Sequence, residues 1–111
     1  MLGLFGKKGY KNIPQSEAKQ RLSANQNIVL LDVRTPEEYR ELHIPKSKSL
    51  PLNQIDGINK VAADKDAEII VYCLSGMRAA SACSQLAAMG YTNVSNMGGI
   101  QSWKYETAKG R

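Results

Sequence analysis

The stretch IIVYCLSGMRAAS, from Ile69 to Ser81, contains the change of pattern that decides the fold. Residues 69–72 form a continuous apolar run with β-branched members, which predicts a buried strand. Residues 77–88 are rich in alanine and leucine and predict a helix, with Gly90 where a C-terminal cap belongs. The chain must turn sharply between this strand and this helix, and Cys73 stands at the start of the turn.

This turn predicts a site for a negatively charged sulfur atom. Gly76 permits a backbone conformation that other residues resist, so the N–H groups at the start of the helix can point inward. These groups, the helix dipole and the charge of Arg78 all favour an anion. A cysteine placed among them is held as a thiolate, which is the nucleophilic form. We therefore interpret Cys73 as reactive and not as a small buried apolar residue.

The second cysteine, Cys83, falls inside the predicted helix among alanine and serine residues. One reading is a resolving role, in which it forms a disulfide with Cys73, but we favour core packing. Two cysteines make no disulfide framework, and with the single histidine, His43, they are too few for a structural zinc site. His43 could serve Cys73 as a general base, but the sequence shows no group to orient it, so we favour a structural histidine.

Outward from the turn, short apolar strands alternate with helices. This order predicts an α/β fold with a small central, mainly parallel sheet and helices on both faces. Asp32 and Cys73 both end strands, at the edge where such sheets bind ligands. Thr35, Pro36 and Glu38 form a capping box at a helix start. The predicted strands cover residues 28–33, 69–72 and 94–97, with an extended piece at 46–50, and the other helices cover 15–24, 53–62, 77–88 and 100–107.

Length and composition indicate one ordinary globular domain. The chain has 111 residues and a net charge of +5, but its basic residues are interleaved with acidic ones and do not alternate with aromatics. We therefore expect no nucleic-acid binding. No apolar run reaches the roughly 20 residues of a membrane span, and residues 1–9 read as a short, poorly ordered lead and not as a secretory signal. We expect a cytoplasmic monomer without membrane contact, because no exposed apolar stripe is evident.

Several ordered motifs together resemble the single-domain rhodanese-like sulfurtransferase family. They span nearly the whole chain after the first ten residues. In order, they are LLDVRTPEEY (Leu30–Tyr39), HIP with a following SLPL (His43–Leu52), IIVYC (Ile69–Cys73), CLSGMR (Cys73–Arg78), and GY-x-NV followed by MGGI-x-x-W (Gly90–Trp103).

The resemblance implies a rhodanese fold over residues 10–108 and a sulfurtransferase that needs no metal or organic cofactor. Cys73 would take the outer sulfur of a small anionic donor such as thiosulfate and hold it as a persulfide. A thiol, on a small molecule or a protein, or cyanide would then accept that sulfur. The resemblance implies an active-site loop formed by Leu74, Ser75, Gly76, Met77 and Arg78.

The chain departs from the family pattern at three positions. Leu42 and Lys46 stand where the family commonly has glycine, and Ala79 stands where a serine often follows the loop arginine. The first two put the local turn geometry in doubt more than the chemistry.

Asp32 and Arg34 flank the end of a predicted strand and read as supporting residues. A functional reading has Asp32 hydrogen-bonding near the cysteine loop and Arg34 pairing with Glu37 or Glu38, but we favour structural support for both residues.

Three questions remain open from the sequence. Arg78 either binds the anionic donor or braces the loop. Leu74 and Met77 make the mouth of the site apolar, which favours a protein-borne persulfide over thiosulfate as donor. Finally, two other functions compete with sulfur transfer. A phosphatase or arsenate reductase also uses cysteine and arginine around an anion loop, but has one residue more between them than the four here. A binding module would have the same fold but no catalytic activity.

Overall fold

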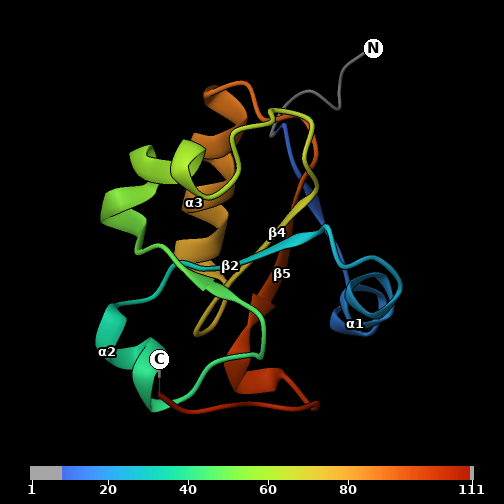
Figure 1. Cartoon of the computed structure of the whole chain (residues 1–111), viewed down its shortest axis with the longest axis vertical. Helices are drawn as coiled ribbons and strands as arrows, with labels where there is room; N and C mark the ends of the chain where they lie inside the picture. Colours follow the sequence, from blue (N-terminus) through green and yellow to red (C-terminus); the bar gives the residue numbers. More distant parts are fainter. Residues whose placement is uncertain (1–8, 111) are drawn as a thin grey trace.

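The computed structural model describes residues 9–110 and contains a five-stranded sheet (Figure 1). Its strands lie in the order β1-β5-β4-β2-β3, and every neighbouring pair is parallel. The α/β class and the parallel sheet are thus confirmed. Except for Gly9, the predicted N-terminal lead lies outside the described residues. The strands are β1 (Lys11–Asn12), β2 (Val29–Asp32), β3 (Lys48–Ser49), β4 (Ile69–Cys73) and β5 (Val94–Gly99).

Helices cover both faces of the sheet, as predicted. Helix α1 (Gln15–Ala24) lies on one side, whereas α3 (Met77–Ala88) and the 3-10 helix η2 (Leu52–Lys60) lie on the other (Figure 1). The strands divide their side chains between these two layers because successive residues of a strand point to opposite faces. In β4, Val71 packs on the α3 side and Tyr72 on the α1 side.

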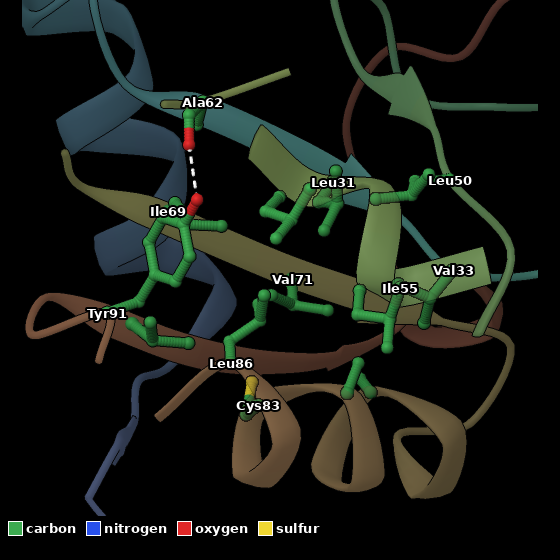
Figure 2. Packing of buried hydrophobic residues seen from close by; sticks show 14 of the residues in the cluster. Leu31, Val33, Leu50, Ile55, Ala62, Ile69, Val71, Cys83, Leu86 and Tyr91 are labelled. Atoms are coloured by element: carbon green, nitrogen blue, oxygen red, sulfur yellow. Dashed lines mark hydrogen bonds between the residues drawn. The ribbon is translucent and has the colours of Figure 1, made fainter. Parts of the chain in front are cut away.

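The core on the α3 side is built from aliphatic side chains and fixes the helix that follows the cysteine. Figure 2 shows Leu86 and Cys83 of α3 near Val71 of β4. At one end of this layer the Tyr91 hydroxyl donates a hydrogen bond of 2.6 Å to the carbonyl oxygen of Ala62. The start of α3 is therefore held at the carboxyl end of β4, where the site forms.

Helix α2 (Pro36–Glu41) begins as the sequence predicts. The Thr35 hydroxyl accepts the N–H of Glu38, the Glu38 carboxylate accepts the N–H of Thr35, and Pro36 occupies the first turn. Both halves of the capping box are therefore present.

Two predicted helices differ from the structure. Residues 53–62 form a 3-10 helix over 52–60 with a kink at Gln54, and the helix expected at 100–107 is only the single turn η3 (Ile100–Ser102). The backbone after η3 is used elsewhere, because Ala108 exchanges two hydrogen bonds with His43. Pairing with a distant segment outweighs local helix propensity here.

The predicted extended piece 46–50 is a strand only at β3, because Lys46 lies in a turn with a φ of 71°. This left-handed conformation favours glycine, so a lysine there costs about 1 kcal/mol. Strand β5 also runs further than predicted, through Gly98 and Gly99. None of the helices in the described part of the chain is long and apolar enough to cross a membrane.

Candidate active site

The sulfur atom of Cys73 lies at the amino end of α3, where two backbone N–H groups point at it. The Gly76 nitrogen lies 3.0 Å and the Ala79 nitrogen 3.3 Å from Sγ. Gly76 has a φ of 113°, a conformation that glycine adopts without strain and that turns the chain from strand to helix. The loop therefore presents donors to the sulfur, as the sequence predicts.

Three other N–H groups of the loop and of the first turn of α3 are unused in the described part of the chain. The N–H groups of Ser75, Met77 and Arg78 have no hydrogen-bond acceptor among the described residues. Leu74 and Met77 project outward with exposed fractions of 42% and 81%, whereas Cys73 has only 1% exposed. Leu74 and Met77 thus form an exposed apolar rim on the loop that holds the buried sulfur.

The end of β5 supports the loop from beneath by a close backbone approach. A Cβ atom built on Gly99 would lie 1.9 Å from the carbonyl oxygen of Leu74, so only glycine fits. The Asn96 amide links the two segments, because it donates to the Gly76 carbonyl at 3.3 Å and accepts the Gly98 N–H at 2.8 Å. The register of β5 against β4 creates this support, and no local signal in the sequence marks it.

Arg78 braces the loop. Its guanidinium donates to both carboxylate oxygens of Glu38, at 2.8 and 3.0 Å, and so ties the start of α3 to α2. Hydrogen bonding to Arg78 lowers the pKa of Glu38 to about 2, and the same bond raises the pKa of Arg78. The carboxylate therefore stays ionised and holds the guanidinium, a contact that is expected of the bracing role. Nothing in the sequence marked Glu38 as this partner.

Asp32 and Arg34 form a buried ion pair with each other, and the contacts of the functional reading are not those that the structure shows. Arg34 donates to Asp32 from Nε and Nη2, at 2.7 Å for the shortest contact, and from its backbone N–H at 2.9 Å. Its Nη2 also donates to the Leu42 carbonyl at 2.6 Å. Asp32 is therefore occupied by Arg34 and not by the cysteine loop, and Arg34 does not pair with the glutamates of α2. The pair therefore connects the turn after β2 to the segment before His43.

The His43 ring is held for packing. Its Nδ1 lies 2.8 Å from the Tyr39 carbonyl oxygen, and its ring stacks on Tyr39 with centroids 3.9 Å apart. Only 6% of His43 is exposed, and its backbone pairs with Ala108. This agrees with the structural role favoured from the sequence.

Cys83 is a core residue of α3. It is fully buried among aliphatic side chains, and this burial raises the pKa of its thiol to about 12. Cys83 is therefore a neutral thiol at physiological pH. Among residues 9–110, no group of three His, Cys, Asp or Glu side chains is placed to hold a metal ion.

Comparison with known proteins agrees with the geometry. The model of the rhodanese-like domain matches residues 14–106. A sulfurtransferase of Allochromatium vinosum is 37% identical over 92 residues, which cover 82% of this chain and 85% of that protein. The thiosulfate sulfurtransferase PspE of Escherichia coli is 35% identical over 81 residues, covering 72% of this chain and 78% of PspE.

Solved structures support the same assignment. A rhodanese from E. coli, determined with anions, superimposes with a TM-score of 0.68 at 30% identity and covers 75% of this chain and 99% of its own. The fold, the cysteine loop and these relatives agree with one another. The chain therefore belongs to the rhodanese-like domain family, and its named relatives there are sulfurtransferases.

Proposed function

We propose that the chain transfers sulfane sulfur through a persulfide on Cys73. One observation carries this proposal: the Cys73 sulfur accepts the N–H groups of Gly76 and Ala79 at the start of α3. Donors that are fixed before the reaction stabilise a sulfur anion without the cost of reorganising solvent. The same donors serve the thiolate before transfer and the persulfide after it.

In the first half-reaction the thiolate attacks the outer sulfur of the donor. With thiosulfate, the new Cys73 S–S bond forms as the bond between the two donor sulfurs breaks, and sulfite leaves with the bonding electron pair. Charge is conserved in this step. Thiosulfate carries two negative charges and the thiolate one, and the products are sulfite with two and the persulfide with one. The N–H groups of Ser75 and Met77 belong to the same loop and have no acceptor among the described residues, so they are available to the added sulfur.

In the second half-reaction an acceptor thiolate attacks the outer sulfur of the protonated persulfide. The S–S bond breaks toward Cys73, which returns to a thiolate, and the acceptor leaves as its own persulfide. This division into two displacements is nucleophilic catalysis. The chain needs no redox partner, because the sulfur moves without net electron transfer to the protein.

The surroundings of the loop favour an organic or protein-borne persulfide over thiosulfate as donor. Arg78 has both guanidinium arms on Glu38, so its charge is compensated and not free to bind a dianion. The rim formed by Leu74 and Met77 is apolar and exposed. Such a rim suits the side chains around a persulfide on another molecule.

The donor preference is measured by comparing kcat/KM for thiosulfate and glutathione persulfide with the same acceptor thiol. We expect the larger value for glutathione persulfide. A much larger value for thiosulfate would contradict the donor preference but leave the sulfur-transfer proposal intact.

The proposal itself is tested by product release without acceptor. Incubation with each donor should release sulfite or glutathione up to one equivalent per chain, and Cys73→Ser should release none. Hydrolysis of p-nitrophenyl phosphate that depends on Cys73 would instead favour the phosphatase class. Absence of both reactions would leave a binding module.

A further inference from the structure

A cavity with apolar and basic lining residues lies away from the cysteine loop. It measures about 460 Å³ and is formed by the last turn of α1, the start of β2, the segment before β3 and Trp103. Its apolar surface comes mainly from the half-buried Leu22, Ile28 and Trp103, because Leu30 and Ile44 are each only 3% exposed. Cavities of this size with an apolar lining and a few polar groups are typical of small-molecule sites.

This cavity is separate from the catalytic site in two respects. It borders Val29, which pairs with Ile69 at the opposite end of β4 from Cys73. Ile69 and Cys73 are four residue steps apart along the strand, or about 13 Å. Leu30 also belongs to the core layer on the α1 side, whereas Cys73 belongs to the layer on the α3 side.

The charges around the cavity are mainly positive. Lys19, Lys46 and Lys48 line it together with one acidic residue, Glu106. Lys19 lies 4.0 Å from Glu106, so one of the three ammonium groups is compensated. Lys46 and Lys48 form no ion pair with any described residue. Two uncompensated cations therefore stand beside an apolar surface.

The backbone at Lys46 adds a second indication. Its φ of 71° is the left-handed conformation that glycine adopts without cost, yet the chain has a lysine there. Lys46 therefore contributes a positive charge to the cavity wall, and its backbone is strained there. Glycine at this position would be more stable but would contribute no cation.

We propose that this cavity binds a small amphipathic carboxylate, with its apolar body against Ile28 and Trp103 and its carboxylate between Lys46 and Lys48. The apolar body leaves water, and the carboxylate meets the two uncompensated ammonium groups. This site is independent of the sulfur-transfer chemistry, because it shares no residue with the cysteine loop.

The test is a titration of the full chain with octanoate, followed by amide chemical shifts in ¹H–¹⁵N NMR spectra. We expect saturable shifts at residues 22–30 and 44–48 and none at residues 73–78. 1-Octanol, which has the same chain without the charge, should bind at least about threefold more weakly. Equal binding of octanol, shifts centred on Leu74 and Met77, or shifts that never saturate would each overturn the proposal.

Two variants separate charge from stability. Lys46→Gly should raise the melting temperature by about 3 °C and weaken octanoate binding by about threefold. Lys48→Gln should weaken binding to a similar extent with little effect on melting. Lys60→Gln, which removes an exposed lysine on η2, is the matched control and should leave the affinity unchanged. An unchanged affinity in both Lys46→Gly and Lys48→Gln would contradict the assignment.

Discussion

The two cysteines of this chain are almost equally buried and chemically different. Cys73 has 1% and Cys83 0% of its surface exposed, and both belong to the same core layer. The Cys73 sulfur lies at the amino end of α3 and accepts two backbone N–H groups. Cys83 lies inside the same helix, where the backbone N–H groups are used by the helix itself, and burial raises the pKa of its thiol to about 12.

The contrast shows that burial alone does not decide the chemistry of a thiol. What differs is access to the unused donors at a helix start, which favour a sulfur anion. A position one or two turns further along the helix has none of these donors. The four predictions below test this contrast.

The largest effect is expected from removing each thiol in turn. Cys73→Ala should reduce sulfur transfer at least about a thousandfold, because no nucleophile remains. Cys83→Ala should keep the rate within about twofold and lower the free energy of unfolding by about 1 kcal/mol through the lost packing. Transfer rates and urea denaturation measure both effects. Comparable loss of activity in the two variants would remove the distinction between the cysteines.

The second prediction displaces the donors and keeps both thiols. In Gly99→Ala the new methyl group would meet the Leu74 carbonyl at 1.9 Å, so the loop must shift away from the sulfur. We expect transfer to fall by about a hundredfold, since small displacements of catalytic geometry are costly. Gly57→Ala is the control, because its Cβ would lie 3.9 Å from Leu50 Cδ1, an ordinary contact. If Gly99→Ala transferred sulfur normally, the placement of the N–H groups would not matter.

The third prediction concerns the ion pair between Arg78 and Glu38. Glu38→Gln can keep the capping interaction with Thr35 but loses the carboxylate that holds Arg78. We expect transfer to fall by about tenfold. We also expect unfolding at pH 7 to cost about 1 kcal/mol less, after allowing for solvent screening.

The pH dependence supplies the control for this variant. The native pKa of Glu38 is lowered from 4.5 to about 2, so the stabilisation is complete above pH 4.5 and is lost as the pH falls toward 2. The difference in stability between wild type and Glu38→Gln should therefore shrink over this range. A difference that stayed constant down to pH 2 would show that the ion pair does not cause it.

The smallest effect concerns Cys83 itself. Since the pKa of its thiol is raised to about 12, it should remain protonated in the native protein well above pH 9. The variant Cys73→Ser leaves Cys83 as the only thiol, and its absorbance at 240 nm, measured as the difference from the variant that also carries Cys83→Ala, should stay flat from pH 6 to 10. A rise within that range, without unfolding, would mean that Cys83 also ionises readily.

The features that the sequence predicted correctly are set by residues that are close together in the chain. The strand before Cys73, the glycine turn and the Thr35 capping box depend on neighbouring residues, and all three appear as predicted. Features set by distant segments were missed. Arg78 and Glu38 are 40 residues apart in the chain. Gly99 approaches Leu74 only because of the register of the sheet. The helix predicted at 100–107 is replaced by backbone pairing between Ala108 and His43. The functional reading paired Arg34 with Glu37 or Glu38, whereas it pairs with Asp32, two residues away and buried beside it.

The position of the transferred sulfur tests the central claim most directly. The protein is incubated with glutathione persulfide or thiosulfate, digested without reductant, and its peptides are weighed by mass spectrometry. The account predicts one added sulfur atom on the peptide containing Cys73 and none on the peptide containing Cys83. An added sulfur on Cys83, or on neither cysteine with both donors, would contradict it.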